Sequence, residues 1–212
     1  MNGLVYCPPG GGKTVNATLV RADKRKKNLL ICTDNSSIVL GNFDRPNLTK
    51  VNVSTVAEFV KAYEDAVAGK KYDNIIVDNL SDLFDMWILE MDASGKFKDM
   101  RQAYQIVYQE IKRMTRRSGA IDTNTIFTAW SDNIEVTLPT GEKVQRLQPK
   151  LPAKIIDNVC GLMNVVAVVT SGEKDGTKFW WYVTEPSERV IAKDQILCRK
   201  FCKPEDIFGE VK

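Results

Sequence analysis

The segment that most constrains this chain is a glycine-rich turn near its amino terminus. An apolar run beginning at Leu4 leads into Gly10-Gly11-Gly12-Lys13-Thr14, and a helix-compatible segment follows. This order approaches the phosphate-binding pattern G-x-x-x-x-G-K-S/T. Glycines at such a turn let backbone N–H groups close around phosphate oxygens without a Cβ in the way. The pattern therefore predicts a strand, a phosphate-binding loop (P-loop) and a helix whose positive end faces the ligand.

The residue types in this turn suit the binding of phosphate and of a metal ion. Lys13 is expected to reach the β- and γ-phosphates of a bound nucleotide, and the hydroxyl of Thr14 is expected to ligate Mg²⁺. Cys7 stands where the pattern has its first glycine, so any conformation that only glycine tolerates would be strained there. The residues predicted to contact the nucleotide are Pro9, Gly10, Gly11, Gly12, Lys13, Thr14 and Val15.

Two later apolar runs end in acidic residues. Asn74–Val77 is typical of a buried strand and ends at Asp78, the position from which a carboxylate can face the metal held by the P-loop threonine. Thr14 and Asp78 are therefore the predicted Mg²⁺ residues. Asp34 follows the run Leu29–Thr33, which we expect close to the P-loop. It is a candidate for orienting an attacking water, with a turn-capping role as the equal alternative.

The alternation of strand-like and helix-like segments over the first part of the chain predicts an α/β fold with a mainly parallel sheet. A capping box at Thr55 and Glu58 starts one helix, and an antiparallel extension is expected at the carboxyl-terminal side. We expect one domain over residues 1–195 and a basic, mixed tail over residues 196–212. The other expected elements are helices at Thr14–Lys24, Leu80–Met91, Met100–Arg117 and Pro152–Leu162, strands at Val51–Val53 and Thr125–Trp130, and hairpins pairing Ile134–Thr137 with Lys143–Leu147 and Val165–Thr170 with Lys178–Thr184.

Composition narrows the function classes. The chain of 212 residues has a formal net charge of +3, so nucleic-acid binding would need local patches and not whole-protein charge. It contains no histidine, which removes every histidine-based triad or general base. Five cysteines, without a signal peptide or a long apolar run, predict a reducing, cytoplasmic location without membrane insertion.

Several segments together resemble a family. Tyr6–Thr14 resembles the loop of the phage-encoded RecA-like ATPases associated with recombination and single-strand annealing, and Ile75–Asn79 matches their metal-binding strand. Leu29–Asp34 looks like their second core strand, with Asp34 where the family has a catalytic glutamate. Ile126–Trp130 resembles the following sensor strand, with Trp130 at a usually polar position. The resemblance implies a RecA-like P-loop NTPase fold that uses ATP and Mg²⁺.

The resemblance also implies partners. Arg189–Asp194 resembles a basic segment whose cations reach the nucleotide of a neighbouring subunit, which makes Arg189 and Lys193 candidate trans-acting residues in a homo-oligomeric ring or filament. Single-stranded DNA, with a single-strand DNA-binding protein as a possible further partner, would meet loops at Asp92–Asp99 and Ser131–Lys154. The second loop has no aromatic residue and carries the cations Lys143, Arg146, Lys150 and Lys154.

Three functions stay open at this point. The first is a slow ATPase, stimulated by DNA or assembly, in phage recombination or replication. The second is a P-loop kinase for a nucleotide or another small acceptor, although no arginine-rich lid motif is evident. The third is a module in which nucleotide controls assembly with little turnover, as the departures at Cys7 and Asp34 would allow. Ser131 or Asp132, after the Thr125–Trp130 strand, are candidate γ-phosphate sensors.

Overall fold

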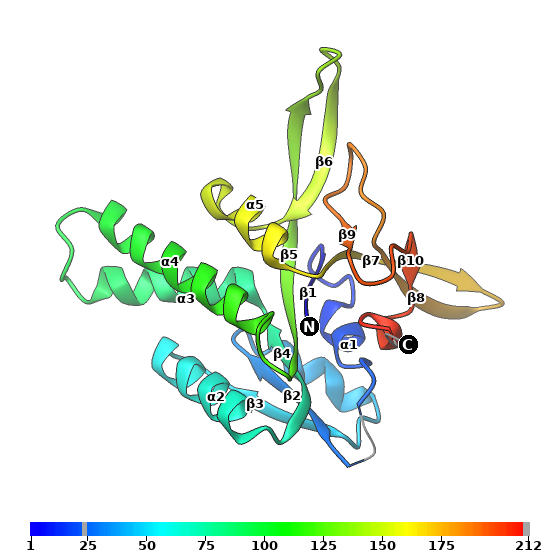
Figure 1. Cartoon of the computed structure of the whole chain (residues 1–212), viewed down its shortest axis with the longest axis horizontal. Helices are drawn as coiled ribbons and strands as arrows, with labels where there is room; N and C mark the ends of the chain where they lie inside the picture. The colour runs from blue at the N-terminus through cyan, green and yellow to red at the C-terminus, as the bar shows by residue number, and fades with distance from the viewer. Residues whose placement is uncertain (23–24, 210–212) are drawn as a thin grey trace.

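The fold is built on one large twisted sheet that carries helices and two projecting hairpins (Figure 1). The computed structural model describes residues 1–22 and 25–209, so Lys24 of the expected first helix lies outside the described residues. The strands pair in the order β10-β8-β7-β1-β5-β4-β2-β3, with β6 beside β5 and β9 beside β7. Their bounds are β1 Asn2–Cys7, β2 Lys27–Cys32, β3 Leu48–Asn52, β4 Tyr72–Asp78, β5 Asn124–Thr137, β6 Lys143–Pro149, β7 Val165–Lys174, β8 Thr177–Val183, β9 Lys193–Asp194 and β10 Phe201–Cys202.

The middle of the sheet is parallel. β1 pairs in parallel with both β5 and β7, β5 pairs in parallel with β4, and β4 pairs in parallel with β2. The carboxyl ends of these strands therefore meet at one edge, where open parallel sheets bind their ligands. On the side of β1 away from β5, β8 and β9 pair antiparallel with β7, and β10 pairs antiparallel with β8. The predicted α/β class, a mainly parallel sheet with an antiparallel carboxyl-terminal extension, is confirmed.

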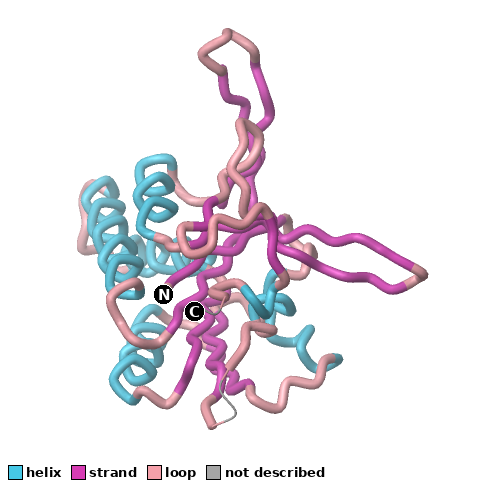
Figure 2. Tube along the Cα trace, turned by 45° about the vertical axis from the view of Figure 1, so that its right-hand side comes forward, coloured by secondary structure: helices cyan, strands magenta, loops and turns pink. Residues whose placement is uncertain are grey.

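The two faces of the sheet are covered differently, because successive strand residues point to opposite sides. Leu4 and Tyr6 of β1 face a core built with four helices, whereas Val5 and Cys7 face a second core formed with the segment after the P-loop and the chain end. Figure 2 shows the longer helices gathered on one side of the strands. These helices are α2 Val56–Gly69, α3 Leu80–Ala93, α4 Met100–Ser118 and α5 Ala153–Leu162.

The helix starts follow from capping residues. The predicted cap at Thr55 is confirmed, since its hydroxyl accepts a hydrogen bond from the backbone N–H of Glu58 at 3.2 Å. Asn79 caps α3 by accepting from the N–H of Asp82 at 2.7 Å. No helix in the described part of the chain has the length and apolar character to cross a membrane.

The expected helix Thr14–Lys24 is wrong in its length. The observed α1 covers Lys13–Ala17 only, and the 3-10 helix η1, Ser36–Asn42, lies beside it. β-Branched residues such as Thr18 have low helix propensity, and the Thr18 hydroxyl bonds to the carbonyl of Val15 at 2.8 Å. The chain then leaves the helix, and the carbonyl of Arg21 accepts from Asn74.

The expected strand at Thr125–Trp130 and the first hairpin strand form one element. β5 runs without a break from Asn124 to Thr137, so its first half lies in the parallel sheet and its second half pairs with β6 (Figure 1). The Tyr6 hydroxyl fixes the base of this hairpin by donating to the carbonyls of Leu147 and Ile191. Its burial raises the pKa of Tyr6, which keeps the hydroxyl protonated as a donor.

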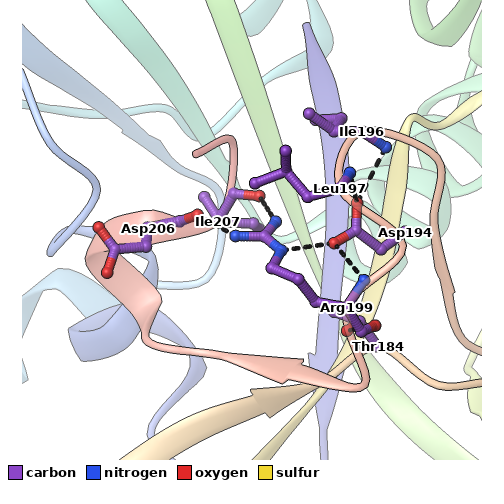
Figure 3. A network of polar contacts seen from close by, with 7 residues as sticks. All are labelled: Thr184, Asp194, Ile196, Leu197, Arg199, Asp206 and Ile207. Carbon is purple, nitrogen blue, oxygen red and sulfur yellow. Dashed lines mark hydrogen bonds and ion pairs between the residues drawn. The ribbon is translucent and has the colours of Figure 1, made fainter. Parts of the chain in front are cut away.

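The chain end packs onto the sheet. β10 pairs with β8, the 3-10 helix η2, Pro204–Asp206, follows, and Ile207 is fully buried. Figure 3 shows how Arg199 joins this segment to β9: its guanidinium donates to Asp194 at 2.6 Å and to the carbonyls of Asp206 and Ile207. Residues 201–208 are thus part of the sheet and its core, while the domain boundary at residue 195 stays a prediction.

Candidate functional site

The turn after β1 has the backbone of a phosphate cradle. Gly10 and Gly12 adopt φ values of +76° and +89°, which residues with a Cβ rarely adopt. A Cβ on Gly11 would lie 2.7 Å from the sulfur of Cys7, so Gly11 has to be glycine because Cys7 fills the space beneath it. Gly12 is the N-cap of α1 without any side-chain cap, which leaves the first N–H groups of the turn to a ligand.

Cys7 does not carry the expected strain. It ends β1 and is buried, and it is absent from the described non-glycine residues with positive φ. Burial raises the pKa of the Cys7 thiol, with Lys13 nearby opposing the rise, so the sulfur is a neutral packing group. The departure from the glycine pattern is therefore accommodated by packing against Gly11.

The carboxylate of Asp78 is the polar centre of the site. It is fully buried at the carboxyl end of β4 and receives three hydroxyl groups from different segments. Thr14, in the first turn of α1, donates to Asp78 Oδ2 with 2.6 Å between the oxygens. Ser36 donates to the same oxygen, and Thr128 of β5 donates to Oδ1. The predicted Thr14 and Asp78 pair is thus brought into direct contact across β5.

The strand order explains this meeting and corrects one expectation. β5 lies between β1 and β4, and β2 lies on the far side of β4, so Asp34 at the end of β2 is not beside the P-loop strand as expected. The carboxylate of Asp34 accepts from the Asn79 amide at 2.5 Å and from the Ser36 backbone N–H at 3.0 Å. Asp34 therefore holds the loop that delivers Ser36 to Asp78, and its role as a water-orienting base stays a prediction.

The remaining P-loop residues differ in how far they are exposed. Lys13 is almost fully buried at the start of α1, Pro9 is exposed on the rim, and Val15 turns its side chain into the core. Asn16 braces the loop by donating to the carbonyl of Gly12 at 2.7 Å, and its own amide oxygen is buried without a partner among the described residues.

The oxygen chemistry fits Mg²⁺, and the cradle fits phosphates. Thr14 and Asp78 provide a hydroxyl and a carboxylate oxygen, the hard ligands that Mg²⁺ takes, with remaining positions filled by water and phosphate. Thr14 and Asp78 would hold the metal, while the Gly10–Lys13 backbone and the Lys13 ammonium would hold phosphate oxygens. The nearby thiol of Cys32 has its pKa raised to about 12 by burial and by Asp78, so it offers no thiolate.

The two candidate trans-acting cations lie in different settings. Arg189 is exposed on the loop beside β6, and its carbonyl accepts from the N–H of Leu147. Lys193 of β9 pairs with Val166 and donates to the carbonyl of Gly161, within the last turn of α5, at 3.0 Å. Burial lowers the pKa of Lys193. Arg189 is therefore available to a neighbouring molecule, while Lys193 serves the helix end of its own chain.

The predicted nucleic-acid residues are mostly engaged within the chain. Lys143 pairs with Glu135 across the β5–β6 hairpin at 2.8 Å, and Arg146 donates to the carbonyl of Glu188. Lys150 lies over the ring of Trp130, the residue just before this segment, at 5.4 Å. Lys154 is exposed on α5. Of the candidate sensors, Ser131 is half-buried and Asp132 is exposed, and both are paired along β6.

Three residues of the site were not among those predicted from the sequence. Thr128 sits inside a buried strand, where threonine is an ordinary strand former, and Ser36 belongs to a polar turn, so neither gave a distinct signal. Trp180 of β8 lies beside the P-loop, since a Cβ on Gly12 would be 3.0 Å from its indole nitrogen. Only the pairing of distant strands brings these side chains to the turn.

The strand order and the geometry of the turn are those of a RecA-like P-loop NTPase domain, in which one strand, β5, separates β1 from the strand that ends in Asp78. Residues 1–196 match a family described as an AAA domain, and the chain belongs to that family. One similar solved structure is a KaiC-like protein from the hyperthermophilic archaeon Pyrococcus horikoshii, with 12% identity and a TM-score of 0.50 over 86% of this chain and 76% of that one. No curated protein matches the chain in sequence.

Proposed function

We propose that this protein binds ATP with Mg²⁺ and hydrolyses it. The single observation that carries the proposal is the contact between Thr14 and Asp78, whose oxygens are 2.6 Å apart although Thr14 lies at the start of α1 and Asp78 at the end of β4. A hydroxyl of the P-loop and a buried carboxylate at this spacing form the protein half of a magnesium site. Membership in an AAA-domain family supports the same reading.

Each residue of the site has its own proposed role in ATP hydrolysis. The Gly10–Lys13 backbone orients the phosphates, and Lys13 stabilises the charge that develops on the transferred group. Thr14 and Asp78 hold the metal, which supplies charge neutralisation when bound. Asp34 is the proposed residue for orienting the water. Arg189 is the proposed cation for the nucleotide of a neighbouring copy in a ring or filament, with Lys193 as the second candidate.

We further propose that the ATPase acts on single-stranded DNA in phage recombination or replication, with a single-strand DNA-binding protein as a possible partner. The resemblance of Tyr6–Thr14 and Ile75–Asn79 to the phage RecA-like loops supports this role. Turnover is expected to be slow and to increase when DNA or other copies of the chain are present.

A turnover assay tests the proposal. Phosphate release from ATP is measured with and without Mg²⁺, and with and without single-stranded DNA at two salt concentrations, for the wild type and for Lys13→Ala. The wild type should require Mg²⁺, and the variant should lose roughly 100-fold or more of the turnover. Full activity in Lys13→Ala would show that this turn is not the site.

A second function is favoured by one observation. Both oxygens of Asp34 already accept hydrogen bonds, from Asn79 and from the Ser36 backbone, which limits its freedom to activate water. A module that binds nucleotide and assembles with little turnover would tolerate this arrangement. Measuring ATP binding, turnover and oligomeric state in the same sample separates the two functions, because such a module binds and assembles without releasing phosphate.

A further inference from the structure

The outer side of the β7–β8 hairpin carries an aromatic surface that the nucleotide site does not use. Phe179 and Trp181 of β8 stack with their ring centroids 5.2 Å apart, and Phe201 of β10 follows along the edge. Phe179 and Phe201 are 44% and 67% exposed, which is unusual for phenylalanine. These side chains border a groove of about 620 Å³.

The groove lies along an open strand edge. β10 pairs only with Tyr182 and Val183, so among the described residues no strand covers the outer edge of Thr177–Trp181. Gly172, opposite Phe179 on β7, leaves room for the stacked pair, because a Cβ there would lie 3.0 Å from Phe179 and 3.1 Å from Trp181. The two rings therefore lie directly over the backbone of Gly172.

Two lysines in or beside the groove are available to an anionic occupant. Lys203 lines it, Lys178 lies over the Trp180 ring at 5.3 Å, and neither forms an ion pair with a described residue. Lys200 is paired with Glu185, and Glu205 is the carboxylate that lines the groove. Lysines on an open edge disfavour strand addition by another protein, whereas they attract a phosphodiester backbone.

We propose that single-stranded nucleic acid binds in this groove, with bases stacked on Phe179, Trp181 and Phe201 and with phosphates near Lys203, while Lys178 adds positive charge beside Trp180 at the edge of the groove. Exposed aromatic faces interleaved with cations are the means by which proteins bind single strands without reading their sequence. The inference rests on the DNA role proposed above, and it moves the contact from the β5–β6 hairpin to the β8 edge.

The groove also adjoins the nucleotide site. Trp180 lines the groove and at the same time lies beside Gly12 of the P-loop. Single-stranded nucleic acid stacked on Phe179 and Trp181 would therefore lie next to Trp180, the side chain that lies beside the P-loop. Trp180 therefore connects the groove to the turn that is proposed to hold nucleotide.

The test measures binding of a fluorescent oligothymidylate by anisotropy at two salt concentrations. The Phe179→Leu/Trp181→Leu variant keeps apolar volume but removes the stacking faces, and it should bind at least about tenfold more weakly. The matched control Lys143→Ala/Arg146→Ala, on the other hairpin, should change affinity less than about threefold. Lys203→Glu should weaken binding most at low salt. Thermal unfolding confirms that each variant is folded.

Three results would overturn the inference. If the wild type binds the oligonucleotide and the leucine variant binds equally well, the groove is not the site, and the DNA role stands with another surface. If the leucine variant changes the oligomeric state without DNA while leaving affinity intact, the groove is an interface between copies. If the wild type binds no single-stranded DNA, the inference and the proposed DNA role both fail, while ATP turnover is judged by its own assay.

Discussion

Two buried aspartates of this protein are held in opposite ways. Asp194 accepts from the guanidinium of Arg199 and from the backbone N–H groups of Ile196, Leu197 and Arg199 (Figure 3). Among the described residues, the carboxylate of Asp78 accepts from hydroxyl groups alone, those of Thr14, Ser36 and Thr128, and no cation forms an ion pair with it. Both side chains are removed from water.

We propose that the difference separates a structural carboxylate from a functional one. A buried charge is costly unless an opposite charge and hydrogen bonds compensate it. Asp194 has its compensation inside the chain, so it can join β9 to the chain end permanently. Among the described residues the donors to the Asp78 carboxylate are neutral, so a cation from solution would complete its charge, as proposed for the metal site. Substitutions at each carboxylate test this contrast.

Replacing Asp78 by asparagine should affect activity most. The Asp78→Asn variant loses the charge that completes the magnesium site, so ATP turnover should fall roughly 100- to 1,000-fold, which is about 3–4 kcal/mol of activation free energy. Its unfolding free energy without Mg²⁺ should not decrease, because an uncompensated buried charge has been removed. Phosphate release and urea unfolding measure the two effects. A marked loss of metal-free stability would contradict the contrast.

Replacing Asp194 by asparagine should show the reverse pattern. Asp194→Asn leaves the Arg199 guanidinium, with a side chain 19% exposed, without its carboxylate, so unfolding should become easier by about 2–3 kcal/mol. ATP turnover of the folded variant should stay close to that of the wild type. Denaturant unfolding monitored by circular dichroism gives the first value. If turnover collapses while stability is unchanged, Asp194 belongs to the site.

The stability of the wild type should depend on pH through Asp194. Burial alone would raise its pKa, but the hydrogen bonds from Arg199 and the backbone lower it below the usual value. The stabilisation is therefore complete above the unfolded pKa of about 4 and is lost as the pH falls through the lower folded pKa. Unfolding measured from neutral pH down to about pH 3 should decline less steeply for Asp194→Asn than for the wild type. Parallel profiles would remove Asp194 as a source of the pH dependence.

Ser36 should have a moderate effect on the metal site. Ser36→Ala removes one of the two hydroxyls on Asp78 Oδ2, so the Mg²⁺ concentration for half-maximal turnover should shift by roughly threefold to fivefold, about 1 kcal/mol. Ser37→Ala is the matched control, because its hydroxyl bonds to Asn52 and not to Asp78. Equal Mg²⁺ dependence in both variants would exclude Ser36 from positioning Asp78.

Lys143 should matter least. Its pair with Glu135 is exposed on the hairpin, so Lys143→Ala should change the unfolding free energy by less than about 0.5 kcal/mol. The same denaturant titration as for Asp194→Asn measures it. If Lys143→Ala lowers the unfolding free energy as much as Asp194→Asn does, the exposed and the buried ion pair contribute equally to stability, which would contradict the contrast.

Much of the site could be predicted because its parts are local. Gly10–Thr14 encodes a turn that only glycines allow, and Asn74–Asp78 encodes a buried strand that ends in a carboxylate. The cap at Thr55 could be predicted for the same reason, since a cap and the N–H it bonds lie in one turn. The length of α1 could not, because tertiary contacts such as that of Arg21 with Asn74 compete with weak helix propensity.

The glycine-rich turn and the fold class could be predicted from local sequence, because backbone conformation and side-chain periodicity act between near neighbours. Which polar groups meet depends on the order of the strands in the sheet. Inserting β5 between β1 and β4 brings Thr128 to Asp78, and placing β2 beyond β4 delivers Ser36. Strand order is set by burial of whole faces of the sheet, so no short segment reveals it.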